Sequence, residues 1–120
     1  MSWSELGEPK YLLLTTSKKD GTTVSTPVWC VCEGDSLLVV TQSDSGKVKR
    51  VRNNPDVLVG PCDMRGRPRG PQVPAHVVLL NAEGTSHAAD VIKHRYGLMG
   101  RLFMARGRNE DRAGLAISSR

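Results

Sequence analysis

Short apolar runs separated by turn signals fill the first part of the chain. Tyr11–Ser17 is rich in Leu and Thr, carries no charge, and is followed by Asp20-Gly21, a dipeptide typical of β-hairpin turns. A second run, Thr22–Cys32, has the β-branched residues of a strand but contains Pro27, and Ser36–Thr41 is a third run. Because Pro has no N–H to give to a strand ladder, we expect an edge, a bulge or a bend at Pro27. The pattern predicts three antiparallel strands joined as a meander.

A helical spacing begins in the middle of the chain. Ser43–Ser45 offers side chains that cap helices, and Gly46–Asn53 carries Val48 and Val51 at the spacing of one helix face. Pro55 ends this predicted helix, because a proline disfavours helical backbone at the residue before it.

Three more strands and a second helix are predicted further along. The strands are Val57–Cys62, Val73–Leu80 and Leu115–Ser119. The helix begins at Thr85 or Ser86 and runs to about Tyr96, with Gly97 as its C′ residue. We therefore expect a mainly β fold of the α+β class, in which six short strands form a small barrel and two short helices are appended. All of residues 1–120 are expected to form one domain.

Composition narrows the class of protein. The chain has 120 residues, of which 38% are hydrophobic, and its apolar runs are far shorter than the ~20 residues of a membrane span. The first ten residues lack the basic start and apolar stretch of a secretory signal. We therefore expect a cytoplasmic protein without a membrane partner, in which Cys30, Cys32 and Cys62 stay reduced.

Charge is distributed unevenly along the chain. The net charge is −3 over residues 1–44 and +7 over residues 45–112, within a total of +5. A basic segment favours an anionic partner, such as nucleic acid, a membrane surface or a phosphorylated small molecule. The five aromatic residues are too few and too scattered to form a platform on which bases stack. A phosphate-bearing cofactor therefore fits better than nucleic acid.

The strongest candidate site is Thr41–Asn54, a strand end followed by a helix start. A helix N-terminus presents unpaired backbone N–H groups and the positive end of the helix dipole, so anions bind there. The residues expected to contact a phosphate are Ser45, Gly46, Lys47 and Arg50. Lys49 and Arg52 share another face of the helix. The alternative is a solvated basic helix, but cations early in a helix oppose its dipole, which favours the phosphate site.

Other candidates are less specific. Trp29 follows Pro27 and has two interpretations. It lies beside the edge of a bound flat ring, or it packs in the core, where a Trp in a strand is more commonly found. The Arg65–Gly70 loop suits acidic groups, but also a solvated hairpin or contact with RNA. Cys30 and Cys32 lack the second pair of a zinc site, and we expect no metal. No catalytic residue is assigned, although a Cys–His pair stays open.

Four stretches of the chain carry a family resemblance. They are YLLLTTSKKDGTTVSTPVW (11–29), VVTQSDSGKVKRVRNNPDV (39–57), PCDMRGRPRG (61–70) and RYG (95–97). With these stretches in this order, the chain resembles the pyridoxamine-phosphate-oxidase-like split-barrel family, in the branch that uses the deazaflavin coenzyme F420. TPVW together with GKVKRVRNNP is the most specific part. The resemblance implies a six-stranded split barrel and a homodimer with cofactor sites at its interface.

The resemblance also implies roles for individual residues. Phosphate-binding positions fall on Ser45, Gly46, Lys47 and Arg50, positions beside the ring system on Pro27, Val28 and Trp29, and a position near the ribityl chain on Thr41. The Arg65–Gly70 loop is expected to approach the cofactor from the same or the other subunit. The acidic polyglutamate tail of F420 suits the additional cations Lys49, Arg52 and Arg67. Cys30 and Gln72 stand where many relatives carry an aromatic residue, which changes the expected substrate pocket.

These implications predict a reductase that transfers a hydride between reduced F420 and a small organic acceptor. Three alternatives stay open. One is an FMN-binding enzyme of the same fold and phosphate site, another is a cofactor carrier without catalysis, and the third is a small barrel that binds nucleic acid.

Overall fold

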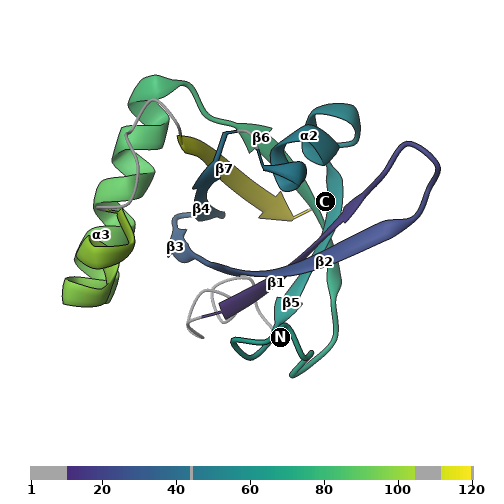
Figure 1. The fold of residues 1–120 in the computed structure, drawn as a ribbon, viewed down its shortest axis with the longest axis horizontal. Coiled ribbons are helices and arrows are strands. Elements are labelled where there is room, and N and C mark those ends of the chain that lie inside the picture. Colours follow the sequence, from purple (N-terminus) through teal and green to yellow (C-terminus); the bar gives the residue numbers. More distant parts are fainter. Residues whose placement is uncertain (1–10, 44, 105–111, 120) are drawn as a thin grey trace.

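The computed structural model describes residues 11–43, 45–104 and 112–119. Figure 1 labels the elements, which in chain order are β1 (Tyr11–Ser17), β2 (Thr23–Trp29), β3 (Val31–Glu33), β4 (Ser36–Gln42), α2 (Gly46–Asn53), β5 (Asp56–Pro61), β6 (Val73–Leu79), α3 (Ala82–Met104) and β7 (Arg112–Ser119). Neither helix in this part of the chain is long and apolar enough to cross a membrane.

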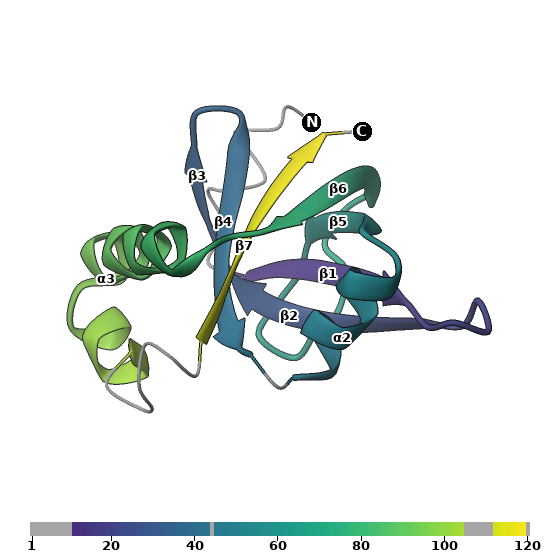
Figure 2. The same ribbon diagram turned by 90° about the horizontal axis from the view of Figure 1, so that it is seen from above.

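The strands of the described residues form one sheet, in the order β2-β1-β5-β6-β7-β4-β3. β2 and β3 lie at opposite ends of this order, yet only Cys30 separates them along the chain. The sheet therefore curls so that Cys30 can join its two edges, and Figures 1 and 2 show the resulting half-barrel. The expectation of a mainly β, antiparallel barrel with two helices is confirmed.

The sheet has seven strands where six were predicted. The predicted strand Thr22–Cys32 divides at Cys30, not at Pro27. Pro27 lies inside β2 opposite Leu13, and it is tolerated because β2 is an edge strand whose outer side needs no N–H donor. At Cys30 the chain crosses from one sheet edge to the other. There the Tyr96 hydroxyl donates a hydrogen bond of 2.6 Å to the Cys30 carbonyl oxygen, which helps to satisfy that corner.

Alternation along the strands separates the barrel interior from the outer face. The interior is built mainly from Leu and Val, namely Leu12, Leu14, Val28, Leu37, Val39, Val57, Val59, Val77, Leu115 and Ile117. Val51 of α2 joins this cluster, and Val48 is also fully buried. α2 therefore closes the barrel end at which β1 and β4 finish. A second cluster, around Leu38, Val40 and Ile92, packs α3 against the outer face of β4.

α3 begins earlier than predicted and continues beyond the predicted break at Gly97. It begins at Ala82, where Asn81 caps it by accepting a hydrogen bond of 2.8 Å from the Gly84 backbone N–H. Gly97 leaves the helical conformation, with a φ of 59°, as expected of a C′ glycine. The chain then resumes a second helical segment that ends at Met104, so α3 consists of two helices joined by a kink at Gly97.

Thr85, one of the two predicted caps, accepts a hydrogen bond from β7. Its buried Oγ1 accepts a hydrogen bond of 3.0 Å from the Gly114 N–H of β7. Thr85→Val removes the acceptor and leaves that N–H unpaired, so we expect the free energy of unfolding to fall by about 1–3 kcal/mol. Urea denaturation measures this loss. Ser86→Ala, at the exposed neighbouring position, is the control, and equal losses in the two variants would contradict the assignment.

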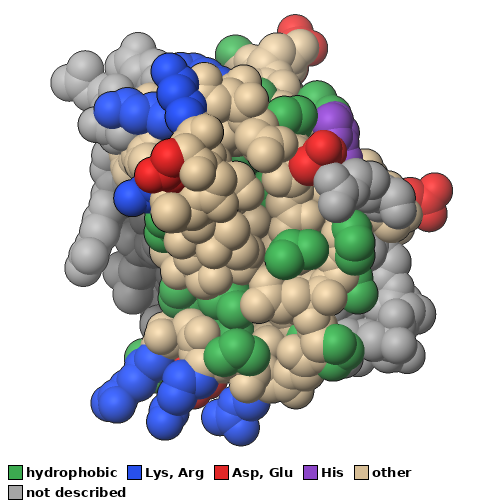
Figure 3. Space-filling model, turned by 90° about the vertical axis from the view of Figure 1, so that its right-hand side faces the viewer, with side chains coloured by type: hydrophobic (Ala, Val, Ile, Leu, Met, Phe, Trp, Pro, Cys, Tyr) green, Lys and Arg blue, Asp and Glu red, His purple; other side chains and the backbone are tan. Residues whose placement is uncertain are grey.

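One outer face of the sheet is covered by neither described helix. α3 contacts β3, β4 and β7, which leaves the outward side chains of β2, β1, β5 and β6. We call these the open face; its residues are Leu13, Thr15, Ser17, Thr23, Ser25, Pro27, Asp56, Leu58, Pro74 and His76. Figure 3 shows the side of the molecule that holds the β1–β2 hairpin. Its centre is hydrophobic or uncharged, and Lys, Arg, acidic and His side chains lie toward the rim.

Candidate functional site

The helix start predicted to bind phosphate is well formed. Ser45 is the N-cap of α2: its extended backbone has a ψ of 155°, and its Oγ accepts a hydrogen bond from the Val48 N–H at 3.4 Å. The Ser45 N–H donates to the Gln42 carbonyl at 3.1 Å, which ties the helix start to the end of β4. β4 holds one end of this turn, and the buried side chains of Val48 and Val51 hold the other. The first backbone N–H groups of α2 therefore have a fixed orientation.

Arg50 folds back over the start of α2. Its guanidinium lies so close to Gly46 that a Cβ there would come within 2.6 Å of Nη1. Its Nε donates to the hydroxyl Oγ1 of Thr16, at the end of β1. Gly46 therefore serves to admit the Arg50 side chain, in addition to the role expected from the sequence. Thr16 was missed by sequence reasoning, although a polar residue at the last interior position of an apolar strand is a signal.

Lys47 lies beside Arg50 and is half-buried. Burial, with the nearby Arg50 charge as a smaller cause, lowers the pKa of the Lys47 ammonium. Among the described carboxylates, none forms an ion pair with Lys47 or Arg50. Two partly desolvated cations at a helix start favour an anion, which supplies the charge that water no longer does.

The other cations of α2 lie in solvent. Lys49 and Arg52 are exposed, and neither contributes to the enclosed helix start. Thr41, predicted to lie near the ribityl chain, is half-buried in β4 opposite Ala113 of β7. It therefore stands just before the turn that leads into α2.

The TPVW segment is divided between two faces of β2. Val28 points into the interior core, so only its backbone is open to a ligand. Trp29 packs against Tyr96, with ring centroids 4.8 Å apart, and against Tyr11 at 6.4 Å. This packing matches the core interpretation of Trp29, although the side chain is only half-buried.

Asp63 organises the Arg65–Gly70 loop. Its Oδ1 accepts hydrogen bonds of 2.9 Å from the backbone N–H groups of Arg65 and Arg67, and its Oδ2 accepts from Arg67 Nε at 2.7 Å. These bonds, led by the one from the Arg67 backbone, lower the pKa of the Asp63 carboxyl. Arg67, predicted to bind the cofactor, is thus already paired. Sequence reasoning missed Asp63, yet an Asp opening a Gly-containing turn is a known signal.

The loop returns to the open face at Gly66. A Cβ there would lie 3.4 Å from Pro27 Cδ and 3.8 Å from Leu13 Cδ1, and the φ of Gly66 is +83°. The structure therefore builds two groups from the predicted residues. One is the start of α2 with Thr16, and the other is Pro27 with the loop. They lie on opposite faces of β1 and β2, about 10 Å apart along the strands.

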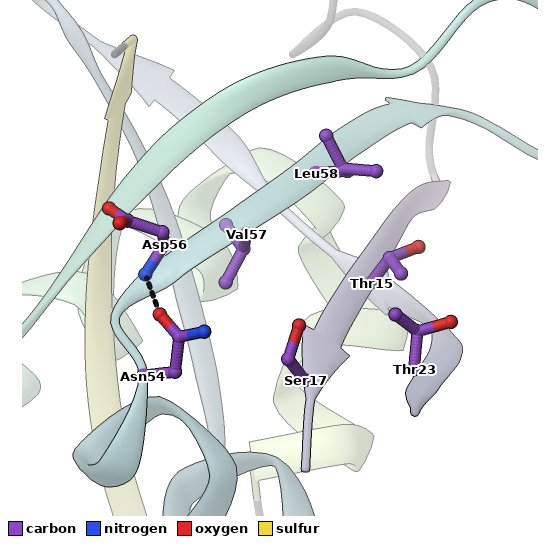
Figure 4. A pocket seen from close by; sticks show the side chains of 7 residues that line it. All are labelled: Thr15, Ser17, Thr23, Asn54, Asp56, Val57 and Leu58. Atoms are coloured by element: carbon purple, nitrogen blue, oxygen red, sulfur yellow. Dashed lines mark hydrogen bonds between the residues drawn. The ribbon is translucent and has the colours of Figure 1, made fainter. Parts of the chain in front are cut away.

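A cavity of about 240 Å³ opens at the far end of the open face. It is lined by Thr15, Ser17, Thr23, Asn54, Asp56, Val57 and Leu58, of which only Asn54, the last residue of Thr41–Asn54, belonged to a predicted site. Figure 4 shows Ser17 and Thr23 on one side and Asn54 and Asp56 on the other. Within the described residues, no group of three or more His, Cys, Asp or Glu side chains is placed to hold a metal ion.

Comparisons with known proteins identify a matching family and similar folds. The family described as pyridoxamine 5′-phosphate oxidase matches residues 4–117. None of the curated protein sequences matches the chain. Similar solved structures include the heme storage protein HutZ from Vibrio cholerae, with a TM-score of 0.74 and 13% identity over 97% of this chain and 86% of that one.

Two further structures are similar. One is described as an F420 reductase, with a TM-score of 0.64 and 18% identity over 98% of this chain and 93% of that one. The other is a putative pyridoxamine 5′-phosphate oxidase from Listeria innocua, with a TM-score of 0.64 and 15% identity over 93% and 85% of the two chains. At these identities the likeness concerns the fold.

Proposed function

Because the chain belongs to the pyridoxamine 5′-phosphate oxidase family, we propose that it is an oxidoreductase that binds the deazaflavin F420 and reduces a small organic acceptor. The observation that carries this proposal is the helix start of α2, where Lys47 and Arg50 are both half-buried and lack a described carboxylate partner. A phosphate group is an anion of the size and charge that such a pair holds.

The chain's own residues supply binding and orientation in this proposal. Ser45 and the first N–H groups of α2 donate to the phosphate, Lys47 and Arg50 neutralise it, and Thr16 holds Arg50 in place. Pro27 and the backbone of Val28 lie about 10 Å from this site along the strands, and because β2 is an edge strand a flat ring would reach them around its edge. A deazaflavin contributes hydride chemistry when bound, and the protein contributes position and charge complementarity.

Two exposed cations favour the deazaflavin over FMN. Lys49 and Arg52 extend from the phosphate site into solvent, where an acidic glutamate tail can reach them. Arg67 contributes less than expected, because Asp63 already binds its Nε. FMN carries the same phosphate but no such tail, so it remains the second candidate.

The proposal is tested by titrating the purified protein with oxidised F420 and with FMN at physiological salt, following ring fluorescence. Micromolar or tighter binding of F420 alone supports it. Preference for FMN assigns the protein to the flavin-binding oxidases of its family. Binding of neither overturns the phosphate site and favours a nucleic-acid-binding barrel, for which a salt titration with a long polyanion is the matching assay.

The pKa of Lys47 predicts how binding depends on pH. Only the protonated ammonium attracts a phosphate, and burial lowers its pKa. We therefore expect affinity to be high at neutral pH and to fall as pH rises through this lowered pKa, earlier than an exposed lysine would titrate. Lys47→Arg keeps its charge throughout, because a guanidinium does not deprotonate in this range. Identical pH profiles for the two proteins would contradict a role for Lys47.

We further propose a homodimer with cytoplasmic location. The open face is uncharged except at Asp56 and His76, and Leu58 on it is 38% exposed, so it suits a self-complementary contact. Cys30, Cys32 and Cys62 are all free thiols, which suits a reducing compartment. Sedimentation velocity at several protein concentrations tests the dimer.

A further inference from the structure

The cavity on the open face forms where two paired strands separate. The β1–β5 ladder ends at Thr15 opposite Leu58, although β1 continues to Ser17 and β5 begins two residues earlier at Asp56. Beyond Thr15 the strands diverge, and the gap becomes the cavity of about 240 Å³. The gap forms a recess of the sheet that opens onto the open face.

The recess is polar and carries an acidic group. Ser17 and Thr23 line one side of it, and Asn54 and Asp56 line the other. The Asp56 side chain is 47% exposed, and its Oδ1 lies 3.2 Å from Nδ1 of His76 on β6. A half-exposed carboxylate beside a polar recess suits a donor-rich cation, of which a guanidinium is the most directional.

The other end of the open face carries the opposite charge. Gly66 rests on Pro27 and Leu13 there, so the arginine loop stands at the edge of the same face. Arg67 and Arg69 are each within ion-pair distance of Asp63. Arg65 is exposed, and no described carboxylate pairs with its side chain.

The spacing of these two ends has the symmetry of an isologous contact. Leu13, beneath the loop, and Ser17, at the cavity, lie about 13 Å apart along β1, with Thr15 midway. A two-fold axis parallel to the face, perpendicular to β1 and above Thr15, places a second copy face to face with the first, exchanges the two ends and so brings each loop over the cavity of the other copy. At the axis the Thr15 hydroxyl donates to Gln72 Oε1 at 2.8 Å and contacts Ser25 Oγ at 2.8 Å, leaving no charge there to oppose the approach.

We propose that in the homodimer Arg65 enters the cavity of the opposite subunit and pairs with Asp56 of the partner subunit, twice per dimer. This inference rests on the dimer of the proposed function and adds its geometry. It also assigns the arginine loop to the partner's surface, not to the cofactor of its own subunit.

A charge exchange tests the pairing. Asp56→Lys places two cations together at both contacts of its own homodimer, and Arg65→Glu places two anions together, so each is expected to raise the dimer dissociation constant at least tenfold. Mixed in equal amounts, the two variants can form a heterodimer in which both contacts again join opposite charges. We expect this heterodimer, and the homodimer of the double variant D56K/R65E, to form near the wild-type concentration. Analytical ultracentrifugation with one variant fluorescently labelled measures it.

Controls separate the possible outcomes. Glu83→Lys changes the charge as D56K does, but on exposed α3, and it is expected to leave the dimer unchanged. Asp56→Asn, which removes the charge without reversing it, is expected to weaken the dimer moderately and serves if D56K fails to fold by circular dichroism. If the wild type is a dimer and the D56N, D56K and R65E variants have the same dimer dissociation constant, the pairing is wrong although the dimer is correct. A monomeric wild type overturns both, and binding of a small cation such as guanidinium in the cavity of a stable monomer assigns it to a ligand.

Discussion

Lys47→Ala is expected to weaken the binding of oxidised F420 by about tenfold to a hundredfold. A charge-assisted hydrogen bond contributes roughly 1.5–3 kcal/mol, and each 1.4 kcal/mol is about tenfold in affinity. Lys47 is half-buried, so water cannot replace it fully, whereas Arg50 stays anchored to Thr16 and retains part of the site. Fluorescence titration at fixed salt gives the dissociation constants.

Variants of two other lysines serve as controls for this experiment. Lys93→Ala makes the same charge change on α3, which packs against the opposite side of the sheet, and it is expected to leave affinity unchanged. Lys49→Ala is expected to matter only for the cofactor that carries its glutamate tail, and not for a tail-free deazaflavin. An unchanged dissociation constant for Lys47→Ala would sink the phosphate assignment, whatever the other two variants do.

Leu14→Ala is expected to lower the free energy of unfolding by about 2–5 kcal/mol. Leu14 is fully buried in the barrel interior, between Thr26 of β2 and Val59 of β5. Truncation removes apolar contact and leaves a cavity that strands on both sides hold open. A chemical denaturation series at one fixed protein concentration measures the loss, because dimerisation adds stability that depends on concentration.

Leu58→Ala is the matched control for this variant. Leu58 is one position along the neighbouring strand β5 but points to the open face, where 38% of its surface is exposed. The same truncation there is expected to cost less than about 1 kcal/mol. Similar losses at Leu14 and Leu58 would mean that the interior and outer faces of β1 and β5 have been assigned the wrong way round.

Local patterns were sufficient where short-range physics decides the structure. The run Tyr11–Ser17 and the helix Gly46–Asn53 match their elements residue for residue, because alternation, capping and a following proline all act within a few residues. The grouping of Ser45, Gly46, Lys47 and Arg50 follows from helix geometry alone, so the sequence was enough to bring them together.

Long-range partners account for what the sequence left open. Nothing beside Cys30 marks it as a corner, because Trp29 and Val31 are both strand formers, and the corner depends on Tyr96, 66 residues away. Thr85 and Asn81 are equally good caps in sequence, but Gly114 of β7 uses the Thr85 hydroxyl. Arg67 looked free because its pairing with Asp63 depends on how the loop closes.

The position of β7 has a consequence for how the protein folds during its synthesis. β7 is last in chain order among the described strands, yet it lies between β6 and β4 and pairs with both. Among the described ladders, only its own join β2-β1-β5-β6 to β4-β3. During synthesis on the ribosome, the edges of β6 and β4 that later pair with β7 therefore stay unpaired until residues 112–119 emerge. Pairs as distant as Leu37 with Ile117 make folding slow, and the nascent chain is most open to aggregation and to chaperones in that interval.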